Sequence, residues 1–218
     1  MPTGTLLDLR AIRFKLADGR ILGPVNWDIE KGDRIALECR IPEAYRGLVD
    51  VISAQLEPLE GYIEELERVV IQTDTRLKEV LRLNQTAHDI LNSGVFPDSL
   101  WLENKRRSLW VVIDRLGITP RNFHLPIKLE PPEIAEKVWA LHFIASRADL
   151  LIGREIFMTG IPEIRTVLKQ RWGDFTGTVI CAAPDKDLPG PVTVRAVLDA
   201  TGAFHYDRVA GSNAGFEP

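Results

Sequence analysis

The sequence predicts an α/β fold in which a mixed sheet core carries an antiparallel β subdomain and an inserted helical subdomain. Polar and apolar residues alternate over the first 25 residues, and apolar residues recur at helical spacing between about 74 and 149. The continuous apolar runs LLIG (150–153) and TVICAA (178–183) flank a helical pattern over about 162–172, which is typical of parallel strands joined by a crossover. We expect residues 1–218 to form one domain with the helical subdomain, 74–149, inserted within it.

Two successive antiparallel strand pairs are expected at the N-terminal end. The first pair turns at Asp18-Gly19, and the second joins VNWDIE (25–30) to RIALEC (34–39) across a Lys-Gly-Asp turn. The unbroken apolar run within 34–39 indicates a strand buried on both faces, so the core begins there. The pattern then predicts a helix from Glu43 to Leu56, followed by strands at 61–63 and 68–72.

The later residues predict helices and then a closing hairpin. Ser99 is a candidate cap for a helix that carries Leu102 and Leu109, and Pro132 begins a second helix. The last strand pair, VTVRAVLDATGAFHYD (192–207), is expected to turn at Thr201-Gly202.

Composition excludes several classes of function. The 218 residues include 27 basic and 31 acidic side chains, which gives a net charge of -4 and disfavours a nucleic-acid partner. The apolar runs are too short to cross a bilayer and no leader is recognisable, so we expect a soluble chain without membrane insertion. Cys39 and Cys181 lie in apolar stretches, which fits a reducing, cytoplasmic compartment. The four histidines lie in separate elements, which argues against a metal site.

Two long stretches resemble the nucleotide-binding subunit of ATP-binding-cassette (ABC) transporters. They are GDRIALECRIPEAYRGLVDVISAQLEPLEGYI (32–63) and EPPEIAEKVWALHFIASRADLLIGREIFMTGIPEIRTVLKQR (130–171), and both match the spacing of that family without a gap. The terminal hairpin resembles the one that usually closes the family's fold. The resemblance covers nearly the whole chain and implies a P-loop NTPase-like, ABC ATPase-like core.

The stretch that aligns with the phosphate-binding loop, CRIPEAYRG (39–47), departs from the family's pattern. A P-loop needs glycines that let backbone N–H groups approach phosphate, a Lys, and a hydroxyl that binds Mg²⁺. Here Tyr45 replaces the Lys, and Arg46 and Gly47 replace the hydroxyl pair. Pro42 removes one N–H and Glu43 adds a negative charge, so we expect phosphate binding to fail.

The other positions implied by the resemblance also differ. Arg154 stands where the family has its Mg²⁺-linked Asp, and the neighbouring Glu155 aligns with the general base, although an ordinary ion pair is an alternative role for it. Pro184 replaces the switch His, and EPPEI (130–134) replaces the signature motif. Gln72 matches the family's Gln that links the core to the helical subdomain.

Three functions remain open on the sequence alone. We expect a non-catalytic ABC-like subunit, a pseudo-ATPase without a cofactor, that serves as scaffold or regulator in a transport-related or other multi-protein assembly. One alternative is an active ATP-binding subunit of an ABC transporter with an atypical phosphate site, and another is an unrelated α/β binding protein.

The expected partner of such a subunit is a protein: a second copy, an ABC-like subunit or a membrane permease. The expected location is the cytoplasm or a peripheral position at the inner face of the membrane. KRR (105–107) between two tryptophans is either a solvated basic face or a docking surface. Together with Gln72, the candidate contacts are Trp101, Arg106, Arg107 and Trp110.

Overall fold

The computed structural model describes residues 4–65, 69–74, 86, 110–145, 148–175, 177–183 and 187–209. The chain divides into two compact units. The sheet unit comprises 1–73, 148–154 and 175–218, and the helical unit comprises 74–147 and 155–174. The helical unit thus ends two residues earlier than the expected subdomain 74–149, and it also takes in a later segment. The first part of the expected helix capped by Ser99, as far as residue 109, lies outside the described residues.

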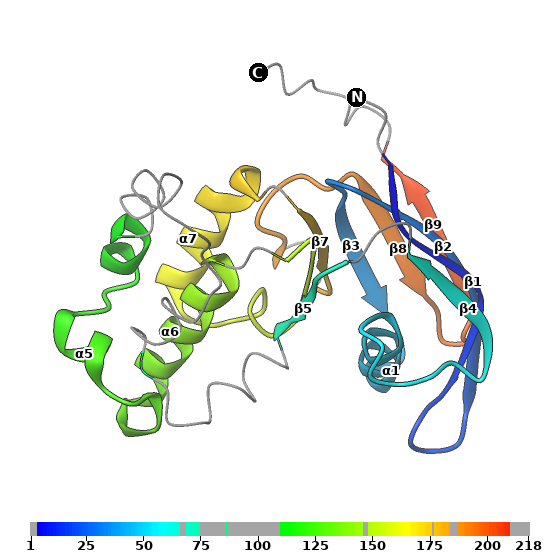
Figure 1. Cartoon of the computed structure of the whole chain (residues 1–218), viewed down its shortest axis with the longest axis horizontal. Coiled ribbons are helices and arrows are strands. Elements are labelled where there is room, and N and C mark those ends of the chain that lie inside the picture. The colour runs from blue at the N-terminus through cyan, green and yellow to red at the C-terminus, as the bar shows by residue number, and fades with distance from the viewer. Residues whose placement is uncertain are drawn as a thin grey trace. The chain divides into compact units, whose positions relative to one another are not determined.

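The sheet unit contains two sheets (Figure 1). One has the strand order β2-β1-β4 and is antiparallel; the other has the order β5-β6-β7-β3-β8-β9, with β9 antiparallel to its neighbour. The strands are β1 (Thr5–Lys15), β2 (Ile21–Glu30), β3 (Arg34–Cys39), β4 (Glu60–Glu65), β5 (Ile71–Thr73), β6 (Leu150–Gly153), β7 (Thr178–Cys181), β8 (Val194–Leu198) and β9 (Phe204–Arg208). The predicted parallel pairing of the two apolar runs, β6 and β7, is confirmed, as is the closing hairpin of β8 and β9.

The predicted pairing of 25–30 with 34–39 is wrong. β2 is one continuous strand that pairs with β1, whereas β3 lies between β7 and β8 in the larger sheet. The turn between β2 and β3 therefore carries the chain from one sheet to the other instead of closing a hairpin.

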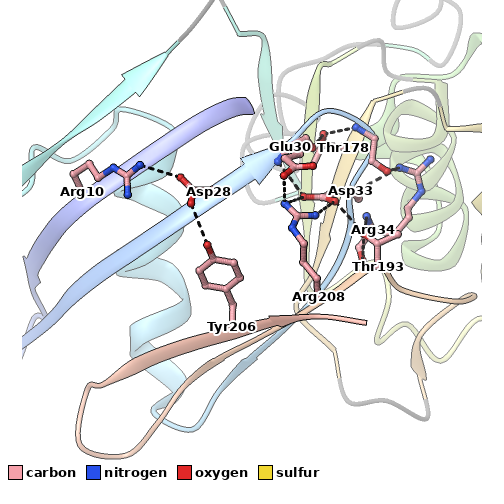
Figure 2. A network of polar contacts seen from close by, with 10 residues as sticks. Arg10, Asp28, Glu30, Asp33, Arg34, Thr178, Thr193, Tyr206 and Arg208 are labelled. Atoms are coloured by element: carbon pink, nitrogen blue, oxygen red, sulfur yellow. Dashed lines mark hydrogen bonds and ion pairs between the residues drawn. The ribbon is translucent and has the colours of Figure 1, made fainter. Parts of the chain in front are cut away.

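A polar network fixes that turn (Figure 2). The Asp33 carboxylate is buried, and it accepts hydrogen bonds from Arg208 Nη1 at 3.0 Å and from Thr193 Oγ1 at 3.1 Å. The neighbouring Arg34 donates to the carbonyl of Gly177 at 2.7 Å and to that of Phe175. Because these partners come from distant parts of the chain, the direction of the turn depends on the completed sheet.

The helix that follows β3 packs closely against the smaller sheet. α1 (Pro42–Ile52) contacts both β1 and β3 and buries Leu48, Val51 and Ile52 in the core between the sheets. It ends before the predicted Leu56, because Ala54 adopts a left-handed backbone with φ 55° and Leu56 is 41% exposed. An ideal Cβ added to Gly47 would lie 2.8 Å from Phe14 Cε2, so the packing requires glycine at this position.

In the helical unit, 110–115 is helical and α5 (Pro120–His124), α6 (Pro132–Ala145) and α7 (Pro162–Arg171) follow, with short 3₁₀ turns η1 (Ile127–Leu129) and η2 (Trp172–Asp174). α6 and α7 lie side by side (Figure 1). Phe157 packs edge-on against both Phe143 and Trp172. The helices predicted from Pro132 and over 162–172 are confirmed. Within the described ranges, no helix is long and apolar enough to span a membrane.

Candidate functional site

The junction between β3 and α1 is the stretch that aligns with a phosphate-binding loop, and it is short. β3 ends at Cys39 and α1 begins at Pro42, so only two residues link strand and helix. The Arg40 N–H donates to the Leu198 carbonyl at 2.9 Å. Pro42 occupies the first helical turn, where a missing N–H is tolerated, and the Glu43 carboxylate lies in the same turn, where the helix dipole favours negative charge. The sequence thus folds here as a normal helix start.

Tyr45 and Arg154 contact each other beside this junction. The Tyr45 side chain projects from the first turns of α1 and the residue is only 6% exposed. Arg154 directly follows β6 in the same unit, and its guanidinium lies 5.5 Å from the centroid of the Tyr45 ring. This geometry is a cation–π contact. By the resemblance, Tyr45 stands at the position of the phosphate-binding Lys, and Arg154 stands at the position of the Mg²⁺-linked Asp.

Arg46 and Gly47 replace the hydroxyl pair. Neither residue directs a polar side-chain group toward the β3–α1 junction. The Arg46 side chain is 75% exposed and pairs with Asp50, one helical turn further along α1, at 3.8 Å. Gly47 has no side chain, and Phe14 occupies the adjacent space. Neither position supplies a hydroxyl for a metal ion.

Cys39 ends β3 as a free, half-buried thiol. Burial raises the pKa of Cys39 to about 12, although the charge of Arg154 acts in the opposite direction. The thiol is therefore protonated near neutral pH and is a poor nucleophile. Among the residues described by the structure, no group of three or more His, Cys, Asp or Glu side chains could hold a metal ion.

Glu155 and Gln72 belong to other segments than the β3–α1 junction. Glu155 is exposed and belongs to the helical unit, and its N–H donates to Asp74 Oδ2 at 2.8 Å. Gln72 is half-buried in β5 opposite Leu151 of β6. Pro184, the position of the switch His, lies outside the described residues.

Asp74 was missed by the sequence analysis. The residue is 1% exposed. Its carboxylate accepts the Glu155 N–H, and its backbone carbonyl accepts a hydrogen bond from Trp139 Nε1 at 3.2 Å. Asp74 therefore joins α6 to the turn that follows β6 within the helical unit. An acidic residue directly after a short, half-buried strand was the only available signal, and it does not specify these partners.

The carboxylates of EPPEI (130–134) are held by residues of their own unit. Asn122 Nδ2 donates to Glu130 Oε2 at 2.9 Å. Lys137 Nζ lies 2.8 Å from Glu133 Oε1 and 3.1 Å from Glu163 Oε1, and its side chain is 6% exposed. Lys137 thus ties α6 to α7. The pKa of Glu163 is lowered by its own backbone N–H and by the hydrogen bond from Lys137.

Of the candidate docking residues, Trp101, Arg106 and Arg107 lie outside the described residues. Trp110 is described and is 56% exposed. Its ring packs at a tilt on Phe123, with 5.5 Å between the centroids.

No protein-family model matches the chain, and no curated protein matches it. Several solved structures match most of its length. An inward-facing ABC transporter, described as of the metal-chelate type, aligns over 94% of this chain and 84% of its own, with 14% identity and a TM-score of 0.65. A dimeric ATP-binding cassette in a post-hydrolysis state with ADP and Pi covers 94% of this chain and 99% of its own, with 14% identity and a TM-score of 0.66. The chain has the ATP-binding cassette fold.

CbiO1 from Clostridium perfringens, part of the ABC transporter complex CbiONQ, shares this cassette fold. It has 15% identity and a TM-score of 0.62, over 92% of this chain and 87% of its own. At such identities the likeness describes the fold and leaves the chemistry to individual side chains. The side chains at the β3–α1 junction of this cassette fold are those described above, with Tyr45 and Arg154 in contact.

Proposed function

We propose that the protein is a non-catalytic, ABC cassette-like subunit that serves as scaffold or regulator in a multi-protein assembly, transport-related or other, without ATP hydrolysis. The observation that carries the proposal is the contact of Tyr45 with Arg154 at the positions that the resemblance assigns to phosphate and metal binding. Each side chain there has a partner within the protein itself.

The chemistry of these groups supports the proposal. Phosphoryl transfer from ATP relies on a positive charge at the β- and γ-phosphates and on Mg²⁺ held by oxygen ligands. The Tyr45 phenol carries no positive charge in either of its protonation states. The guanidinium of Arg154 has only donors and cannot ligate a metal ion. Glu43 brings a negative charge to the helix start, where phosphate would otherwise be attracted.

A protein partner is the second part of the proposal. One of the structures with the same fold is a dimer and another is part of a transporter complex. We infer a partner of the same general kind: a second copy, an ABC-like subunit or a membrane permease, reached in the cytoplasm or at the inner face of the membrane. Trp110 is a described contact candidate because it exposes a large aromatic surface, a residue type enriched at interface hot spots.

Calorimetric titration with MgATP tests the first part. We expect no binding heat at millimolar nucleotide and no phosphate release above a protein-free blank. An active bacterial cassette measured in the same buffer is the control for assay sensitivity. Turnover by the unmodified protein would overturn the proposal and favour an active ATPase with an atypical phosphate site.

A further inference from the structure

The helical unit contains a pocket that shares only Trp110 with the proposed protein contact. It has a volume of about 420 Å³, which is within the range of small-molecule sites. Its described lining comes from the helical turn at 110–115, from α5 and from the loop between them. The lining residues are Trp110, Ile113, Asp114, Ile118, Thr119, Pro120, Phe123 and His124.

One wall of the pocket is fixed by a helix end. Gly117 adopts a left-handed backbone with φ 68°, and its N–H donates to the Asp114 carbonyl at 2.9 Å. The N–H of Ile118 donates to the Ile113 carbonyl at 3.1 Å. This pair of bonds is a Schellman motif, which brings the side chains of Ile113 and Ile118 together.

A second wall is fixed by a helix start. Thr119 caps α5 in a capping box: its hydroxyl oxygen accepts the Asn122 N–H, and the Asn122 side chain accepts the Thr119 N–H. Pro120 occupies the first turn and Phe123 packs between Trp110 and His124. Because helix caps hold both walls, the pocket exists before a ligand binds, which lowers the entropy lost on binding.

The charge of the pocket selects its ligand. Trp110, Ile113 and Asp114 lie on one face of the helical turn, since they are three and four residues apart. No Lys or Arg is among the described lining residues, and no hydrogen bond or ion pair joins the Asp114 carboxylate to another described residue. A carboxylate beside an exposed Trp ring provides both charge pairing and cation–π attraction.

We propose that this pocket binds a small organic cation: a quaternary or protonated amine on an apolar body, with the charge between Trp110 and Asp114 and the apolar part against Ile113, Ile118 and Pro120. All of these residues belong to the helical unit, so cation binding can be tested whether or not the protein hydrolyses ATP.

Three probes test the proposal by NMR titration of the full chain. The titration follows the chemical shift of the Trp110 indole N–H. This signal is assigned because it is missing from the spectrum of Trp110→Leu. Choline and its uncharged isostere 3,3-dimethylbutanol differ only in the charge, and benzyltrimethylammonium adds an apolar body. We expect choline to bind at least about tenfold more tightly than the alcohol, and benzyltrimethylammonium to bind more tightly than choline.

Variants separate the two contacts. Asp114→Asn should weaken binding of both cations by about tenfold and leave binding of the alcohol unchanged. Asp207→Asn, which makes the same charge change at an exposed position on β9, should have no effect. Trp110→Leu keeps the wall apolar and should also weaken binding of the cations, measured by calorimetry. Equal binding of choline and its isostere, no binding of any probe, or unchanged affinity in Asp114→Asn would each overturn the proposal.

Discussion

The guanidinium of Arg154 lies over the ring of Tyr45, 5.5 Å from its centroid. Arg154 follows β6 and Tyr45 lies in α1, so the contact joins two elements of the sheet unit that are distant in the sequence. The guanidinium cation and the aromatic ring attract each other, so a substitution of either residue alone removes an interaction of the other.

Energetic coupling between Tyr45 and Arg154 is the first prediction. Tyr45→Leu, Arg154→Met and the double variant form a mutant cycle that removes the ring, the charge and both. We expect a coupling free energy of unfolding of about 0.5–2 kcal/mol, because the contact is half-buried. Urea unfolding measures it. Additive effects of the two substitutions would show that the contact contributes nothing.

Restoring the phosphate-site lysine should not create an ATPase. In Tyr45→Lys the new ammonium lies close to the Arg154 guanidinium, so the variant should be less stable than the unmodified protein. MgATP should give no thermal shift, whereas a ligand at 100 times its dissociation constant would add about 2.7 kcal/mol. Thermal unfolding and phosphate release are the measurements. ATP-dependent stabilisation of the variant would mean that the rest of the phosphate site is intact.

Gly47→Ala should destabilise the protein even though alanine favours helices over glycine by about 1 kcal/mol. The added methyl group would lie 2.8 Å from Phe14 Cε2, and such overpacking costs about 1–3 kcal/mol. Gly173→Ala is the matched control, because an added Cβ there meets nothing within 4 Å. Phe14→Leu in the Gly47→Ala background should recover part of the loss, as measured by the urea midpoint.

His142 should make the protein less stable in mild acid. Burial lowers the pKa of His142 to about 4, and its Nδ1 has no hydrogen-bond partner among the described residues. Between pH 6.5 and 4 the unfolded chain takes up a proton that the folded chain does not, so stability falls as the pH falls, by about 3 kcal/mol over the full range.

The variant His142→Leu should flatten this dependence in urea unfolding measured from pH 7 to pH 4. His205→Gln, a change at an exposed position on β9, should preserve it. A slope that persists in His142→Leu would assign the acid sensitivity to other groups.

The basic, tryptophan-containing segment should control partner capture. Replacing Trp101 and Trp110 with Ala, and Arg106 and Arg107 with Glu, should abolish co-purification of the native partner, since Trp and Arg carry much of the binding energy at interfaces. The melting temperature should change little. Retained co-purification would place the docking surface elsewhere on the chain.

The sequence was sufficient to predict elements whose pattern is local. The continuous apolar runs of β6 and β7 require burial on both faces, and the turn at Thr201-Gly202 identifies the last hairpin. The connection from β2 to β3 could not be predicted, because a Lys-Gly-Asp turn between strands fits a hairpin equally well. What decides it is the contact of Asp33 with Arg208 and Thr193, which no local pattern contains.

The candidate site was predictable in composition but not in geometry. The loss of glycines and of the lysine from CRIPEAYRG is visible in the sequence, whereas the contact of Tyr45 with Arg154 depends on the arrangement of β6 and α1. The exposed direction of the Arg46 side chain depends on its pairing with Asp50. Asp74 was missed because its partners, Trp139 and Glu155, become neighbours only in the folded unit.

The position of β3 between β7 and β8 has a consequence for synthesis on the ribosome. β3 leaves the exit tunnel early, but both strands that flank it are translated more than a hundred residues later. During that interval the backbone N–H and C=O groups along its two edges have no permanent partners in the nascent chain, which is the situation in which chaperones protect exposed strands. Native pairing of β3 is therefore a late event in biogenesis, and a ribosome stalled before β8 would hold a chain whose central strand is still open to misassembly.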